Sequence, residues 1–180
     1  MSDLTLRAQL KTMLESVAGT GKVHDYERFN AGEWDKFLEF FLDPTSRKIF
    51  GWEITRESVK VEKMTGGNKK VIHSYVIKGY YGLQDAMATE KIFNAIIDLI
   101  LQKFIDNKIP GTQGHSLPKV SPIQPRVYGS VLCHYAEIRM EVAELWAETP
   151  ETAVDLYEIG FKYYLKPGDE YACHAYINTL

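Results

Sequence analysis

Residues 49–81 read IFGWEITRESVKVEKMTGGNKKVIHSYVIKGYY and predict a long β-hairpin. The two arms, Ile49 to Met64 and Lys69 to Tyr81, are rich in the β-branched and aromatic residues that favour strands. Between them, Thr65-Gly66-Gly67-Asn68 supplies glycine and asparagine, which tolerate the positive φ of a tight turn. We therefore expect an antiparallel pair of strands at the centre of the fold.

The apolar alternation changes parity within the first arm. Phe50, Trp52 and Ile54 occupy even positions, whereas Val59 and Val61 occupy odd ones. A slip of one residue near positions 56–58 predicts a β-bulge or a bend there. Each arm has roughly 13 to 16 residues, against about 5 to 6 in an ordinary strand. We therefore expect the hairpin to project beyond the body of the domain.

Helices are predicted on both sides of this hairpin, because apolar residues recur there at steps of three and four. The first stripe is Leu6, Leu10, Met13, Leu14 and Val17, ended by Gly19; the second is Trp34, Phe37, Leu38, Phe41 and Leu42, stopped by Asp43-Pro44; the third is Phe93, Ile96, Ile97, Ile100, Leu101 and Phe104, in a helix from about Asp85 to Asn107. Residues 22–28 are expected to be extended.

The remaining sequence predicts a loop and three further strands. Residues 108–125 contain four prolines and no period, which indicates a surface loop. Residues 126–145 predict one long strand with a bend at Gly129. Strands are also expected at 154–165 and 171–177, joined by the turn at 166–169. The fold class is therefore α+β with a mainly antiparallel sheet and two to three packed helices: one domain over 1–145, with a C-terminal β extension over 146–180.

The composition excludes several classes of protein. The chain has 180 residues, 45% of them hydrophobic, which suits one folded globular domain. Its net charge is −3, so a strong nucleic-acid binder is disfavoured. The longest apolar run, residues 95–101, is too short to span a membrane, and the start of the chain does not resemble a signal peptide. With two cysteines only, we expect reduced thiols and synthesis in a cytoplasm.

A zinc site is the first chemical hypothesis to weigh, because cysteine precedes histidine at Cys133-His134 and at Cys173-His174. Neighbouring residues on a strand point to opposite faces, so each pair would send one ligand to a given site. The spacing also lacks a short CxxC loop. We therefore expect no metal, with small core cysteines instead.

Three other candidate sites are weak. A nucleophilic pairing of Cys133 with His174 or His115 lacks any local signature. An acid/base cluster of His24, Asp25, Glu27 and Arg28 lacks a second convergent group and is more typical of solvated charge pairs. Gly19-Thr20-Gly21-Lys22 follows a helix and lacks the first glycine of a phosphate loop. We therefore expect no catalytic residues and no cofactor.

The hairpin tip is basic, with Lys60, Lys63, Lys69 and Lys70 around the turn. Such lysines could meet an acidic partner or a phosphate. They are equally typical of an exposed hairpin that must stay soluble and avoid edge pairing. Both interpretations follow from a projecting hairpin.

Four segments resemble a family encoded among the tail-assembly genes of Mu-like, long-tailed bacteriophages and prophages. They are GKVHDYER at 21–28, GWEITR at 51–56, GYYGL at 79–83 and LCHYAE at 132–137. The element order is also similar to that of tail terminator, or tail completion, proteins, and the resemblance covers about residues 4–145. It implies a homo-oligomeric ring, most often a hexamer, that caps the tail tube, and it implies no catalytic residues.

The expected function is therefore that of a virion structural protein at the head-proximal end of the tail, made in the host cytoplasm. Its expected partners are other copies of itself, the major tail tube protein and a neck or head–tail connector protein, with DNA only passing through the ring. A neck or connector subunit is the alternative, and a small α+β ligand-binding domain or enzyme, with Cys133, His134 and Tyr135 lining a pocket, is the rival of another class. Because a two-stranded ribbon is marginal alone, the hairpin is the predicted subunit interface. Its predicted interface residues are Val59, Val61, Met64, Lys69, Val71 and His73.

Overall fold

The computed structural model describes residues 3–28, 34–43, 47–128 and 131–147, and these form an α+β fold. Seven strands make one sheet in the order β1 (Lys22–His24), β2 (Phe50–Lys63), β3 (Lys69–Gly82) and β7 (Val131–Trp146), followed by three short strands. These three, β4 (Gly114–His115), β5 (Lys119–Val120) and β6 (Gln124–Tyr128), each pair with β7. All pairings are antiparallel except that of β1 with β2. The predicted fold class is confirmed.

The hairpin and its bulge are confirmed. β2 and β3 pair along their full length, from Phe50 with Tyr81 to Lys63 with Lys69. The register shifts between Arg56 and Ser58, which leaves Glu57 as the extra residue. Beyond the shift, Val59 lies opposite His73. His73 is an odd-numbered residue of β3, as are the residues opposite Trp52 and Ile54, so all of these lie on the same face. The bulge therefore returns the odd-numbered valines to the face that the even-numbered core residues occupy.

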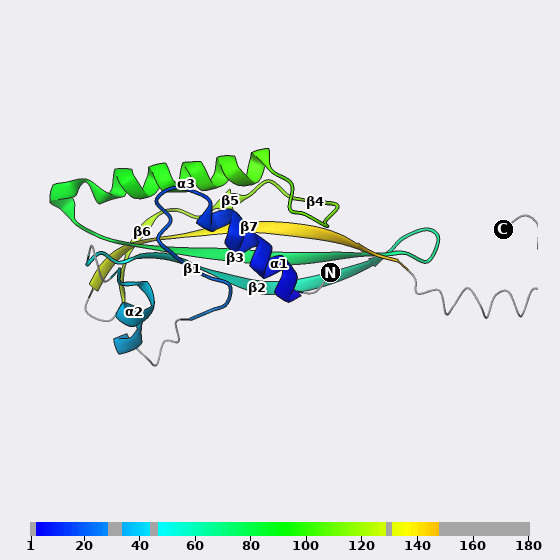
Figure 1. Cartoon of the computed structure of the whole chain (residues 1–180), viewed down its shortest axis with the longest axis horizontal. Coiled ribbons are helices and arrows are strands. Elements are labelled where there is room, and N and C mark those ends of the chain that lie inside the picture. Colours follow the sequence, from blue (N-terminus) through cyan, green and yellow to red (C-terminus); the bar gives the residue numbers. More distant parts are fainter. Residues whose placement is uncertain (1–2, 29–33, 44–46, 129–130, 148–180) are drawn as a thin grey trace, which may run out of the picture.

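The hairpin is not an isolated ribbon, because β7 pairs with β3 from Lys69 opposite Trp146 to Gly82 opposite Cys133. The expectation of a two-stranded ribbon that is marginal alone is therefore wrong. The turn after Lys63 still extends past the helices and past the end of β7 (Figure 1). What projects is the end of a three-stranded ribbon with a hairpin turn.

Two predicted segments on the other side of β7 differ from the structure. The single strand expected over 126–145 is instead two strands, β6 and β7, in which Tyr128 lies opposite Val131. The bend expected at Gly129 lies outside the described residues. The loop expected over 108–125 contains β4, β5 and the start of β6. Proline cannot donate to a ladder and is confined to sheet edges, which is where these strands lie. Pro118 and Pro122 separate the strands, and Pro125 lies within β6. Three short edge strands therefore occur where a loop was expected.

Two helices cover one face of the sheet, as predicted for their stripes. They are α1 (Asp3–Glu15) and α3 (Thr89–Asp106), and α3 lies along the length of the sheet (Figure 1). The start expected at Asp85 instead forms a short 3₁₀ helix, η1 (Asp85–Met87). The large core on this face includes Leu10, Trp52, Tyr75, Phe93, Ile100, Ile138 and Val142.

The third helix, α2 (Trp34–Phe41), lies on the opposite face, at the end of the sheet away from the hairpin turn (Figure 1). A smaller aromatic core gathers there, made of Phe37, Phe41, Ile49, Tyr80, Tyr128, Cys133 and Tyr135. Phe37 stacks on Tyr128 with ring centroids 4.8 Å apart. Among the described residues, one end of the sheet is thus packed on both faces, whereas the hairpin turn at the other end extends past the helices.

Candidate interaction surface at the hairpin end

The six predicted interface residues divide into two groups. Val59, Val61 and Met64 are 44%, 54% and 43% exposed, and Lys69 is exposed too. Val71 and His73 are 0% and 3% exposed. The argument that these last two need a second subunit to cover them is therefore wrong, since the chain covers them itself. The interface role of the four exposed residues stays a prediction.

The exposed valines lie beyond the start of α1. Asp3, in the first turn of α1, accepts a hydrogen bond from the Tyr75 hydroxyl at 2.8 Å and pairs with Arg56 at 3.5 Å. Tyr75 and Arg56 are opposite one another in the hairpin, on the near side of the bulge. Val59 and Val61 follow on β2 toward the turn, where α1 has not yet begun. Their exposure is thus a consequence of where the first helix starts.

A buried polar pair lies next to these valines on the same face. His73 Nε2 lies 3.4 Å from Glu144 Oε2, and the two side chains are 3% and 1% exposed. Trp146 Nε1 donates to the same carboxylate at 3.1 Å. Because His73 belongs to β3 and Glu144 to β7, their contact attaches the third strand to the hairpin close to the turn, and Trp146 supports Glu144 from within β7. Sequence reasoning missed this pair, since His73 was assigned to the interface.

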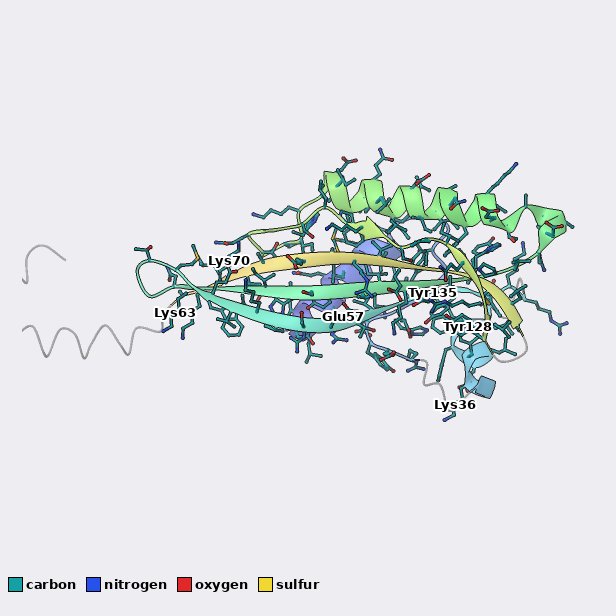
Figure 2. The ribbon with its side chains drawn as sticks, turned by 180° about the vertical axis from the view of Figure 1, so that it is seen from behind. Lys36, Glu57, Lys63, Lys70, Tyr128 and Tyr135 are labelled. Carbon is teal, nitrogen blue, oxygen red and sulfur yellow. The ribbon has the colours of Figure 1, made fainter. Side chains whose placement is uncertain are left out.

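The lysines of the tip face solvent around the turn. Lys63 lies opposite Lys69, and Glu62 opposite Lys70. Lys60 Nζ pairs with Glu62 at 2.7 Å, and both side chains are well exposed. Figure 2 shows Lys63 and Lys70 at the hairpin end, far from Tyr128 and Tyr135 at the other. The tip thus combines exposed cations with exposed apolar side chains.

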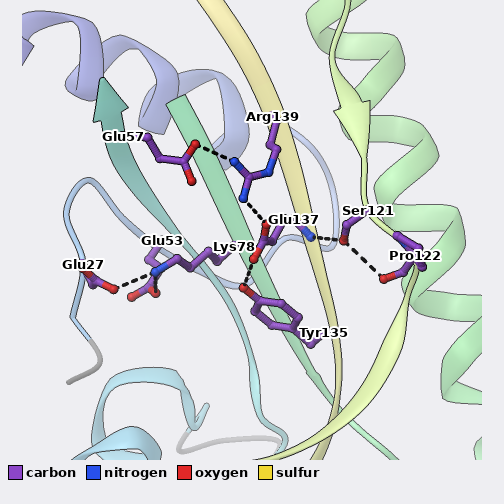
Figure 3. A network of polar contacts seen from close by, with 9 residues as sticks. All are labelled: Glu27, Glu53, Glu57, Lys78, Ser121, Pro122, Tyr135, Glu137 and Arg139. Carbon is purple, nitrogen blue, oxygen red and sulfur yellow. Dashed lines mark hydrogen bonds and ion pairs between the residues drawn. The ribbon is translucent and has the colours of Figure 1, made fainter. Parts of the chain in front are cut away.

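A second group of polar residues lies on the α2 face, across the middle of the sheet (Figure 3). Arg139 on β7 bonds Glu57 at 2.5 Å and Glu137 at 2.7 Å. Tyr135 donates to Glu137 at 2.6 Å. Burial acts to raise the pKa of Glu137, but the bonds from Tyr135 and Arg139 outweigh it and hold that pKa below its usual value. The bulge residue Glu57 thus links β2 to β7 across β3.

Glu53 is the buried member of this region, 0% exposed. It accepts hydrogen bonds from the Tyr80 hydroxyl at 2.8 Å and from the Arg28 backbone N–H at 2.9 Å. Lys78 Nζ lies 3.6 Å from Glu53 and 2.7 Å from Glu27. A buried carboxylate with this many donors is held in place by them, which is the arrangement of a structural group. Sequence reasoning assigned no role to Glu53. Because Glu53 directly follows Trp52 in the strand, its side chain points to the opposite face.

Cys133 and His134 lie on opposite faces, as strand alternation predicts. Cys133 is in the aromatic core, and burial raises the pKa of its thiol to about 12. His134 Nε2 lies 3.1 Å from Thr89 Oγ1, and its ring stacks on Phe93. A thiol with so high a pKa is a poor nucleophile. Cys173 and His174 lie outside the described residues, so the absence of zinc there stays a prediction.

The other histidine candidates make local contacts. His115 lies opposite Val142, about 30 Å along β7 from Cys133 at ~3.3 Å per residue, so these two do not form a catalytic pair. His24 Nε2 lies 3.1 Å from the Phe40 carbonyl, and burial lowers the pKa of His24. In the part of the chain that the structure describes, no group of three or more His, Cys, Asp or Glu side chains could hold a metal ion.

Two cavities among the described residues bear on the ligand-binding rival. One, of about 150 Å³, is lined by residues that include Arg47, Lys48 and Thr89; the other, of about 350 Å³, is an open groove that includes Lys70, His115 and Glu141. Sites for small molecules usually measure about 300–1,000 Å³ and are enclosed and mostly apolar. Cys133, His134 and Tyr135 line neither cavity. Neither of these two cavities is therefore the pocket expected for the rival.

Comparison with protein-family models and with curated proteins gave no match to this chain. None of the described helices is both long and apolar enough to cross a membrane. The surface at the hairpin end therefore has to be interpreted from its own residues.

Proposed function

We propose that this protein is a virion structural protein of a long-tailed bacteriophage: a tail terminator that caps the tail tube as a homo-oligomeric ring. In this proposal the ring also forms the joining surface to the head or neck. It acts by binding other proteins, in the virion, and DNA only passes through its centre. The tail tube protein and a neck or connector protein are its partners besides its own copies.

The exposed apolar side chains at the projecting end of the hairpin are the observation that supports this proposal best. Val59 and Val61 near the end of β2, and Met64 directly after it, remain 43–54% exposed, although the base of the same strand is buried. Exposed apolar residues gathered at one end of a molecule favour contact with another protein. A patch at one end, used against a different surface of the next copy, gives the head-to-tail contacts from which rings are built.

The order of elements supports the terminator role more specifically. The N-terminal helix α1 comes first, β1 and α2 follow, and then come the long hairpin, the packing helix α3 and further strands. Apart from β1 and α2, this is the order implied by the resemblance of the sequence to tail terminator proteins, and such a likeness is an analogy of fold. A neck or head–tail connector ring would use the same contacts, so it remains the alternative within this class.

Electron microscopy of assembled tails tests the proposal. Tails with a gold label on this protein should show a ring on the tube axis at the head-proximal end. A single copy, or a position off the axis, would contradict it. A label found only on the head side of the neck would favour the connector instead. Tails assembled without this protein are the control and should show tubes of uncontrolled length without heads attached.

A further inference from the structure

The outer edge of β2 is open over its hairpin half. β1 pairs with β2 only at Gly51, Trp52 and Glu53. From Ile54 to Lys63, β2 has no strand on its outer side among the described residues. Arg7 reaches the Ile54 carbonyl at 3.3 Å, which covers the start of this edge and nothing beyond it. The remaining edge can pair with another strand.

The side chains on this edge differ between its two faces. Val59 and Val61 lie on the helix-covered face, where they are 44% and 54% exposed. Ser58, Lys60 and Glu62 lie on the other face. A strand that fits here would place apolar side chains beside the valines and polar ones beside Lys60. It would have to alternate with a period of two.

The sequence outside the described residues contains a segment with this alternation. Of 33 residues after Ala147, positions 157–165 read YEIGFKYYL, with Tyr157, Ile159, Phe161, Tyr163 and Leu165 alternating with Glu158, Gly160, Lys162 and Tyr164. The pattern predicts one mostly apolar and one more polar face. These apolar residues are odd-numbered, as are Val59 and Val61. In a register that places odd-numbered residues opposite odd-numbered ones, the apolar set lies beside the two valines.

Charge and position favour the same pairing. Residues 148–161 contain four carboxylates, Glu148, Glu151, Asp155 and Glu158, and no lysine or arginine. The hairpin end that they would approach has the four lysines of the tip. The described chain also leaves the sheet there, because Trp146 lies opposite Lys69 and Lys69 opposite Lys63. Seven residues, 147–153, join Trp146 to Val154 and span up to about 24 Å at ~3.4 Å each.

We infer that residues 154–165 of one copy add a strand to the open edge of β2 in a second copy. This rests on the proposed function, since the linker is long enough to reach an edge in its own chain as well. Exchange between copies gives each subunit one donor strand and one acceptor edge. Contacts of that head-to-tail kind propagate from subunit to subunit and close into a ring. The partner of the hairpin is thus the C-terminal segment of a neighbour.

Photo-crosslinking from Val61 in the full chain tests this inference. Val61, which is exposed, is replaced by p-benzoylphenylalanine in chains of normal isotopic composition. These are mixed with heavy-isotope chains that are unaltered at Val61, under conditions that allow subunits to exchange. After irradiation, mass spectrometry should find adducts of the light Val61 peptide with heavy peptides from residues 154–165. Adducts only within the light chain, adducts elsewhere, or no adducts would overturn the inference.

Two proline variants sharpen the test. Ile159→Pro places a residue without an N–H in the middle of the donor strand and should reduce the heavy–light adduct at least tenfold. Glu151→Pro, beside Pro150 in the linker, is the matched control and should keep it. An equal yield in both variants would overturn the inference. If negative stain shows rings but the adducts lie elsewhere, the strand exchange is contradicted and the proposed ring is not. If the strands are exchanged in fibres or dimers and no rings are seen, the ring is contradicted and the strand exchange is not.

Discussion

At the scale of single residues, Glu53 is a buried carboxylate that depends on the donors around it. The Tyr80 hydroxyl donates to it at 2.8 Å in a site that is 0% exposed. Tyr80→Phe removes this donor without changing the ring. The buried carboxylate then loses a hydrogen bond that water cannot replace, so we expect the free energy of unfolding to fall by about 1–3 kcal/mol. Urea titration followed by tryptophan fluorescence measures the loss.

Tyr135→Phe is the matched control for this prediction. Its hydroxyl also donates to a carboxylate on the same face, Glu137, at 2.6 Å. The Glu137 side chain is 20% exposed, so water can replace the missing donor. We expect a loss below about 1 kcal/mol, smaller than that of Tyr80→Phe. If the two variants cost the same, burial of Glu53 is not what makes its hydrogen bond important.

Gly79 is a second residue whose identity follows from its contact. It lies opposite Trp52 in the hairpin, and a Cβ on it would overlap the indole ring. Trp52 is fully buried and stacks on Phe93, so it has no space to move into. Gly79→Ala should lower the free energy of unfolding by about 1–3 kcal/mol through overpacking. Thermal denaturation measures this, with Gly82→Ala as control, because there the nearest atom would be 3.5 Å away. A neutral Gly79→Ala would contradict it.

At the scale of elements, the bulge in β2 decides which side chains reach the core. Glu57 is the extra residue, and its contact with Arg139 is exposed, of the kind worth about 0–1 kcal/mol. Deleting Glu57 leaves Arg56 opposite Tyr75 and Ser58 opposite Ser74, with every later pair unchanged. We therefore expect a regular hairpin whose melting temperature changes by only a few degrees.

Deletion of Val76 is the control for the bulge prediction. β3 pairs with β2 and β7 at once, and its pairing with β7 has no shift that could absorb a missing residue. Losing Val76 would turn one half of β3 to the wrong face, so we expect this variant not to fold. Circular dichroism and the yield of soluble protein compare the two deletions. Equal damage from both would show that the bulge itself is required.

The sequence predicted elements well where the pattern was local. The hairpin arms, the bulge and the three helices follow from periodicity, glycine and proline, so their bounds were within a few residues of the structure. The placement of β7 beside β3 could not be predicted, because strand partners depend on contacts far apart in the chain. The same reason hid Glu53 and the His73–Glu144 pair: each is buried by residues from other strands. Val71 and His73 were assigned to an interface because that third strand was unknown.

At the scale of the whole molecule, the length of the hairpin is the feature that the proposed ring uses. Replacing residues 62–70 by Asn-Gly keeps the native pair of Val61 with Val71 and closes it with a two-residue turn. This removes Met64, Lys63, Lys69 and Lys70, but no residue of the two cores. The shortened chain should therefore fold, with a circular dichroism spectrum like that of the wild type.

Assembly should respond differently from folding in this variant. If the hairpin end contacts a neighbouring subunit, the shortened chain loses part of that contact, and the yield of finished virions in a complementation assay should fall at least tenfold. Leu99→Ser on α3, where the side chain is 46% exposed, is the matched control for loss of an exposed apolar group and should leave the yield unchanged. A folded, shortened chain that supports a normal yield would show that another surface joins the subunits. The shortened chain keeps the helices and the base of the sheet of the wild type. Its difference from the wild type in virion yield therefore measures what the projecting end contributes.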